Sequence, residues 1–153
     1  MELKKYLILI MILSFTNFLH ADIIKPAENL TAYDVVKIQL TALKNNNKPN
    51  KNAGIKQTWV FAHPENKKIT GPYERFEKML LGNQYSLLLN HESHKIKLIM
   101  NSNNLYIYNV ELISSDKKMY FYEWHLEKNS TDECSSCWFT TIVSPPTNKG
   151  NII

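Results

Sequence analysis

The sequence predicts an α+β fold in which N-terminal helices pack on a curved antiparallel sheet of about four strands. Apolar residues recur at helical spacing through the first half of the chain. From Lys95 onwards the pattern changes to the alternation that is typical of strands. Ser115-Asp116 then separates two long runs rich in aromatic and β-branched residues, which predicts a hairpin.

Export is predicted by the first residues of this 153-residue chain. Lys4 and Lys5 precede a short apolar run, and the segment ends in Leu19-His20-Ala21, so residues 1–21 are typical of a signal peptide cleaved after Ala21. A membrane-spanning helix needs about 20 apolar residues, and this run is shorter. The alternative is that the segment stays uncleaved as an anchor. We therefore expect a periplasmic or secreted protein with no stable membrane span after cleavage.

The exported part is predicted to contain a polar lead (22–29), one domain (30–146) and a loose tail (147–153). The formal net charge of the whole chain is +4, but its lysines are scattered and flanked by acidic residues. Nucleic-acid binding requires a clustered basic face with interleaved aromatic residues. We therefore expect no nucleic-acid partner.

Three helices are expected in the first half. Thr31 is a predicted N-cap with Asp34 three residues later, and this helix should end near Asn45. The Asn- and Lys-rich segment 44–52 should be a solvated loop, and residues 55–62 a short helix or, alternatively, a strand. A third helix should begin at Gly71-Pro72 and end at Gly82, with a stripe formed by Tyr73, Phe76, Met79 and Leu80.

Strands are expected from Lys95, over 104–114, over 118–128 and over 138–143. A two-residue turn at Ser115-Asp116 would place Tyr108 opposite Glu123, and Tyr106 opposite His125. A carboxylate beside an imidazole in a partly apolar cavity can perform general acid–base catalysis. Tyr106, Tyr108, Glu123 and His125 are therefore candidate ligand-binding residues. Glu123 and His125 would be the catalytic pair if the protein were an enzyme; a polar, solvent-facing strand end is the alternative.

Arg75, within the predicted third helix, is the chain's single arginine. A guanidinium holds a carboxylate in two parallel bonds, which a lysine cannot do. We expect Arg75 to brace the helix against the sheet through Glu123 or Glu111. Anion binding in a pocket is its alternative role.

The mature chain has two cysteines, in the sequence Cys134-Ser-Ser-Cys137. A redox pair needs a helix after it and a zinc site needs about two more ligands, whereas a strand is predicted to follow. A structural disulfide is expected, with free thiols and redox or metal chemistry as alternatives. His91-Glu-Ser-His94 lacks the spacing of a zinc-protease motif and is predicted to be a solvated connector. We expect neither a metal nor a cofactor.

The segments VVKIQLTALKNN, GIKQTWVFAHPENKKITGPYERFEKM and QYSLLLNH resemble an uncharacterised family of bacterial and plant proteins, domain of unknown function 4864. That family is similar to the nuclear transport factor 2-like cone of helices on a curved sheet. The resemblance covers residues 35 to about 143 and implies the cone fold, but no catalytic residues. The Cys134–Cys137 insertion and the Asn- and Lys-rich loop depart from the family pattern.

A non-enzymatic binding module for a small ligand or a protein partner, with homodimerisation through the sheet, is the function that we expect. The alternative is a small acid–base enzyme, isomerase- or dehydratase-like, that uses Glu123 and His125, with Tyr108 or Arg75 stabilising negative charge. A redox protein that uses Cys134 and Cys137 is a third hypothesis.

Overall fold

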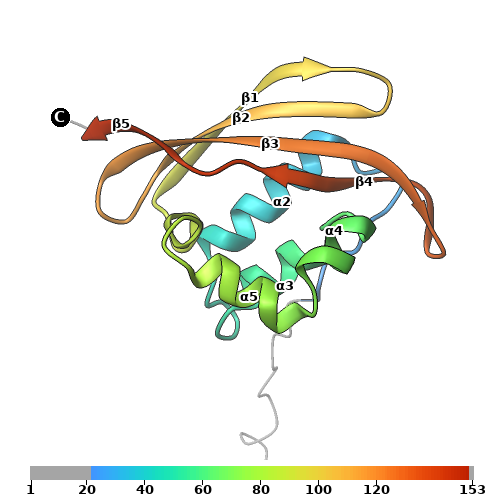
Figure 1. Ribbon diagram of the computed structural model, residues 1–153, viewed down its shortest axis with the longest axis horizontal. Helices are drawn as coiled ribbons and strands as arrows, with labels where there is room; N and C mark the ends of the chain where they lie inside the picture. Colours follow the sequence, from blue (N-terminus) through green and yellow to red (C-terminus); the bar gives the residue numbers. More distant parts are fainter. Residues whose placement is uncertain (1–21, 152–153) are drawn as a thin grey trace, which may run out of the picture.

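The computed structural model describes residues 22–151. Figure 1 shows a curved antiparallel sheet with a layer of helices on one side. This arrangement confirms the α+β class. The core lies between the two layers, where Val36, Leu40, Leu43 and Ile55 of the helices meet Val110, Leu112, Trp124 and Leu126 of the sheet, all nearly inaccessible to solvent.

Helix α2 (Ala32–Lys44) lies closest to the sheet in Figure 1. It begins with the expected cap: the Thr31 hydroxyl accepts the Asp34 N–H at 3.1 Å, and the Asp34 carboxylate accepts the Thr31 N–H at 2.9 Å. These reciprocal bonds satisfy two N–H groups that would otherwise lack a partner. Hydrogen bonds from Thr31 also lower the pKa of Asp34.

Helix α3 (Ala53–Val60) confirms the predicted short helix and packs tightly against α2. A Cβ on Gly54 would lie 2.1 Å from the Ala42 carbonyl oxygen, so glycine permits this approach. The loop before α3 is not solvated throughout, because Asn46 is only 2% exposed. Its Oδ1 accepts the Ile55 N–H at 3.0 Å and its Nδ2 donates to Asn52 at 3.1 Å. The prediction of a solvated loop was therefore wrong at Asn46.

Helix α4 (Pro64–Thr70) was not predicted from the sequence. It begins at His63, whose Nδ1 accepts the Glu65 N–H at 3.2 Å. None of its residues is buried, so it lacks the apolar stripe from which a helix is recognised. Gly71 ends α4.

The predicted third helix is α5 (Tyr73–Leu81), which buries Phe76 and Leu80. Pro72 is its N-cap, and Gly82 ends it as expected. A 3₁₀ turn, η1 (Ser86–Leu88), follows.

The sheet contains β1 (Ser93–Asn101), β2 (Leu105–Ile113), β3 (Lys118–Thr131) and β4 (Cys134–Val143) in that spatial order. The fifth strand, β5 (Thr147–Asn151), pairs with the first part of β3, while β4 pairs with the second part. The prediction of a loose tail was therefore wrong for residues 147–151. Backbone pairing with β3 holds this segment, and its sequence, TNKGN, has no strand pattern.

The hairpin register differs from the predicted one by one residue. Tyr108 pairs with Trp124, and Ile107 pairs with His125. The turn is one residue longer than expected, because the Ser114 N–H donates to the Lys118 carbonyl oxygen at 3.0 Å and Lys117 adopts a φ of 62°. A left-handed residue at the end of a three-residue loop is a common hairpin geometry, usually supplied by glycine.

Candidate functional site: an apolar cavity beneath strand β4

A cavity of about 280 Å³ lies between the helical layer and the β3–β4 side of the sheet. Its walls come from each helix of residues 22–151 and from β3 and β4. They include Leu43, Ala62, Ile69, Phe76, Met79, Leu80, Leu88, Trp124, Ile142 and Val143, together with the polar residues Gln39, Thr58, Asn66, Thr70, Tyr85, Thr140 and Thr141.

The link between α3 and α4 forms one boundary of this cavity by pairing with the edge of β4. The Thr140 N–H donates to the Phe61 carbonyl oxygen at 2.8 Å, and the His63 N–H donates to the Thr140 carbonyl oxygen at 2.9 Å. The Asn66 amide donates to the carbonyl oxygens of Thr140 and Thr141. These contacts fix the start of α4 against the sheet and leave the cavity between α4, α5 and β4.

A closed hydrogen-bond network lies at the base of the cavity. Gln39 Oε1 accepts the Trp124 indole N–H at 2.9 Å and the Thr140 hydroxyl at 2.7 Å. Gln39 Nε2 donates to the Thr58 carbonyl oxygen at 3.2 Å. A buried amide is tolerated when its donors and acceptors are satisfied. The polar groups of Gln39, Trp124 and Thr140 are therefore bonded to one another and not left for a ligand.

The polar side chains at the side of the cavity also form hydrogen bonds within the protein. The Tyr85 hydroxyl donates to the Val143 carbonyl oxygen at 3.0 Å, and burial raises the pKa of Tyr85. The Thr70 hydroxyl donates to the Asn66 carbonyl oxygen at 2.7 Å. Within residues 22–151, no charged side chain lines the cavity, and no buried side-chain polar atom lacks a hydrogen-bond partner. The cavity thus favours an uncharged, apolar occupant.

Three exposed apolar side chains surround this cavity. Ile69 of α4 is 68% exposed, Met79 of α5 is 38% exposed and Ile142 of β4 is 53% exposed. Single exposed apolar residues are common on protein surfaces. Here, however, three residues from separate elements belong to one apolar cavity, so they extend its apolar surface towards solvent.

Sequence reasoning missed this cavity because its walls are far apart in the chain. The single signal was Gln39, a polar residue in the apolar stripe of α2 and only 1% exposed. A buried amide needs partners from another element, which could have indicated a polar contact with the sheet.

The predicted acid–base grouping is not formed. His125 Nε2 lies 3.3 Å from Glu123 Oε2, but the Glu123 side chain is 58% exposed and the pair does not line the cavity. Tyr106 and Tyr108 lie on the opposite face, where their rings stack at 6.1 Å. Burial raises the pKa of Tyr108 to about 12. The one-residue register difference separates the two pairs, so the prediction that they share a face was wrong.

Arg75 does not brace α5 against the sheet. Arg75 is exposed, and its guanidinium forms no ion pair with any residue between 22 and 151. The predicted partners are paired elsewhere, Glu111 with Lys95 at 3.4 Å and Glu123 with His125. The buried face of α5 carries Phe76 and Leu80, and Arg75 does not belong to that face. The brace expected for Arg75 was therefore wrong, and Arg75 does not line the cavity described above.

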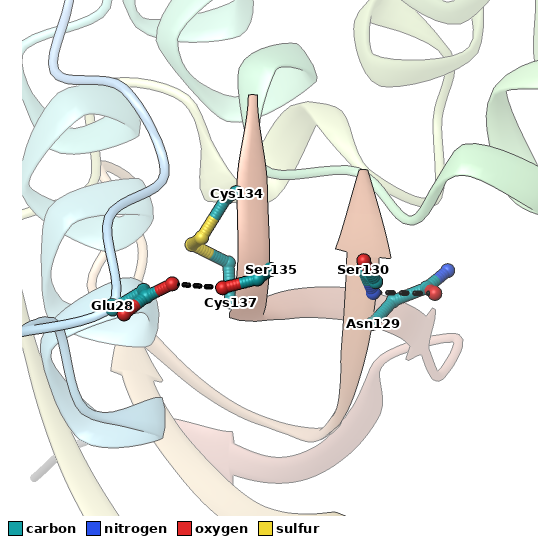
Figure 2. The surroundings of a disulfide bond; sticks show 6 residues. All are labelled: Glu28, Asn129, Ser130, Cys134, Ser135 and Cys137. Atoms are coloured by element: carbon teal, nitrogen blue, oxygen red, sulfur yellow. Dashed lines mark hydrogen bonds between the residues drawn. A yellow bond between two sulfur atoms is a disulfide. The ribbon is translucent and has the colours of Figure 1, made fainter. Parts of the chain in front are cut away.

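The expected disulfide joins Cys134 to Cys137 within β4, with a Cα–Cα distance of 6.0 Å (Figure 2). Residues three apart in a regular strand point to opposite faces. A register shift between Asn129 and Thr131 interrupts the β3–β4 ladder here and allows the bridge. Figure 2 also shows Ser135 hydrogen-bonded to Glu28 of the lead segment.

The His91–His94 segment is not the solvated connector that was predicted. His91 is 2% exposed, and its Nδ1 lies 2.7 Å from the Leu88 carbonyl oxygen. Its Nε2 lies 2.7 Å from His94 Nδ1. Within the described part of the chain, no group of three or more His, Cys, Asp or Glu residues is placed to hold a metal ion.

Comparisons of this chain with protein-family models, with curated proteins and with solved structures found no match. Among residues 22–151, no helix has the length and apolar character that crossing a membrane requires.

Proposed function

We propose that this protein is an exported binding module that holds an uncharged, apolar small molecule in the cavity beneath β4. The observation that supports this is the lining itself. It is mainly apolar, and its polar groups bond to one another rather than towards the cavity. A ligand with a charge would lose its hydration there without gaining a partner.

The cavity volume limits the size of this ligand. About 280 Å³ corresponds to roughly nine volumes of ~30 Å³, the share of one water molecule in the liquid. A ligand of roughly ten non-hydrogen atoms would fill it. Because burying a methylene group contributes about 0.8 kcal/mol, each added carbon should tighten binding about fourfold until the cavity is full.

Two observations support export. Residues 1–21 have the pattern of a signal peptide cleaved after Ala21, although they lie outside the described residues. The Cys134–Cys137 disulfide is typical of proteins from oxidising compartments. We infer that the protein acts in a periplasmic or secreted location.

The cone architecture and the relation to domain of unknown function 4864 remain part of this proposal. Helices on one face of a curved sheet, with a cavity between the layers, agree with what that resemblance implies. The binding function does not depend on this relation, because the lining of the cavity supports it independently.

Calorimetric titration with straight-chain alcohols from butanol to decanol tests the binding function. We expect the affinity to rise with each methylene group and to level off near octanol, when the cavity is full. Alkylammonium and alkanoate ions of matched chain length should bind more weakly, because the lining offers no counter-charge. A series without chain-length dependence would contradict the proposal.

Two variants on the same helix provide the control. Met79→Glu introduces a charge beside the cavity and should weaken alcohol binding at least tenfold. Leu81→Glu alters a residue that is 48% exposed and does not line the cavity, so it should bind as the unmodified protein does. Equal affinities in the two variants would place the binding elsewhere.

A further inference from the structure

Strands β1 and β4 lie at the two ends of the β1-β2-β3-β4 order, and their outer edges differ in what covers them. The edge of β4 is covered at Thr140 and Thr141, where it bonds to residues 61–63 and to the Asn66 amide. On the other side, β1 pairs with β2, and no further strand among residues 22–151 pairs with β1. Unpaired edges are usually covered, charged or shortened, since their free N–H and C=O groups can recruit another strand.

The second half of β1 is neither covered nor charged within residues 22–151, and its ladder is interrupted by a single bulge. Leu98, Ile99 and Met100 are consecutive and are 45%, 55% and 47% exposed. The ladder also shifts here: Leu98 pairs with Tyr108 and Met100 with Ile107, which leaves Ile99 without a Cα partner on β2. The lysines that could repel another strand, Lys95 and Lys97, lie only in the first half.

We propose that β1 is an interface on which a second copy of this chain pairs, antiparallel and centred on Ile99. This register places Leu98 of each copy opposite Met100 of the other, so apolar side chains face each other on both sides of Ile99. Lys97 then lies opposite Asn101, and Lys95 opposite Asn103. Cross-strand neighbours with like charges are destabilising, and this arrangement avoids them. A register centred on Lys97 would instead oppose two lysines.

Such pairing closes after two copies. An antiparallel edge-to-edge contact about a two-fold axis uses the same strand of both chains, so it leaves no second β1 edge free. The far side of each sheet carries β4, which residues 61–63 bridge at Thr140, and β5, so neither strand takes part in the β1 contact. The contact is short compared with the ~1,600 Å² of a typical stable interface, so we expect a dimer of micromolar affinity rather than a permanent one.

Sedimentation velocity across protein concentrations from about 5 to about 500 μM tests the association. We expect a monomer–dimer equilibrium, which Ile99→Lys shifts at least tenfold towards the monomer. Leu81→Lys, at an exposed apolar residue of α5, should leave it unchanged. A protein that stays monomeric over this range, or that forms unlimited assemblies, overturns the proposal.

A cysteine at the two-fold axis tests the register. Ile99→Cys adds the single free thiol, because both cysteines of the described chain are already bonded to each other. Directly opposed residues of antiparallel strands lie about 4.5–5.5 Å apart, within the range of a disulfide. Mild oxidation should therefore link Ile99→Cys chains into covalent dimers, while Leu81→Cys chains remain monomers. Equal cross-linking of the two variants would show random collision and reject the register, even if Ile99→Lys failed to fold.

Discussion

The side chains of His91 and His94 share one hydrogen bond, from ring nitrogen to ring nitrogen, at 2.7 Å. The other nitrogen of His91 faces the Leu88 carbonyl oxygen, which can only accept, so His91 Nδ1 carries the proton. His91 Nε2 is then the acceptor and His94 Nδ1 the donor. This assignment holds only while His91 is neutral.

Acid should destabilise the protein through this pair. Burial is the main cause that lowers the pKa of His91 to about 4, from an ordinary value of 6.5, and burial also lowers the pKa of His94. Between about pH 4 and pH 6.5 the unfolded chain binds more protons at His91 than the native protein does. The contribution of His91 to stability is therefore full above pH 6.5 and falls as the pH drops towards 4. We expect His91 to contribute a loss of about 2 kcal/mol between pH 7 and pH 5.

Urea denaturation at the two pH values checks this prediction. His91→Asn keeps a donor to the Leu88 carbonyl oxygen but does not titrate, so the pH dependence should become flatter by about 2 kcal/mol. His125→Gln, which leaves the His91–His94 pair intact, is the control. Equal slopes in the two variants would assign the acid sensitivity to other groups.

The network at the base of the cavity should also be sensitive to substitution. Gln39→Leu removes the acceptor of the Trp124 indole N–H and of the Thr140 hydroxyl, leaving only their mutual contact at 3.3 Å. We expect a loss of about 1–3 kcal/mol in the free energy of unfolding. The losses in Gln39→Leu and Trp124→Phe should not add in the double variant, since both break the same bond. Strict additivity in a double-mutant cycle would contradict the network.

Asn46 should matter more for the free energy of unfolding than Asn50, an exposed asparagine of the same loop. Asn46→Ala leaves the Ile55 N–H without its acceptor in a buried position, at an expected cost of about 1–3 kcal/mol. Asn50→Ala, in the same loop, changes an exposed side chain and should cost less than about 0.5 kcal/mol. Thermal unfolding of the two variants measures the difference, and matching melting temperatures would refute it.

Reduction of the disulfide should weaken the protein without unfolding it. The ring closed by Cys134 and Cys137 is small, so the chain-entropy contribution is only about 2 kcal/mol. Denaturation with and without a reductant measures this loss. The Cys134→Ser/Cys137→Ser protein should show the weakened value in both conditions. Loss of the folded state on reduction alone would show that the bridge does more than restrict this part of β4.

Arg75→Ala should be nearly neutral, within about 0.5 kcal/mol, because the guanidinium has no ion partner within residues 22–151. The matched change on the buried side of the same helix, Phe76→Ala, should cost about 3–5 kcal/mol. Chemical denaturation of both variants checks the contrast, and a cost at Arg75 close to that at Phe76 would restore its role as a brace.

The elements that the sequence predicted correctly are those with strong local signals. The Thr31–Asp34 cap, the apolar stripes of α2 and α5 and the alternation in β2 and β3 are all readable within a few residues. The cysteine pair was readable as well, because its spacing and the strand after it favour a structural bridge.

The features that the sequence did not predict have non-local or backbone causes. The polar strand β5 is held by backbone pairing, and a single left-handed residue, Lys117, changes the register of the hairpin. That one-residue change moves Glu123 and His125 away from Tyr106 and Tyr108. The cavity depends on how α4 and α5 lie against β4, which no short pattern records.

The backbone hydrogen bond between the Thr140 N–H and the Phe61 carbonyl oxygen joins residues that are far apart in the sequence. This contact can form only after the chain through Thr140 is present, and its sequence separation adds to the entropy cost of closing it. A growing chain that has not yet reached Val143 therefore has no complete cavity. If the chain crosses a membrane unfolded, the cavity closes only on the other side, so a molecule bound under the proposed function would come from the destination rather than from the compartment of synthesis.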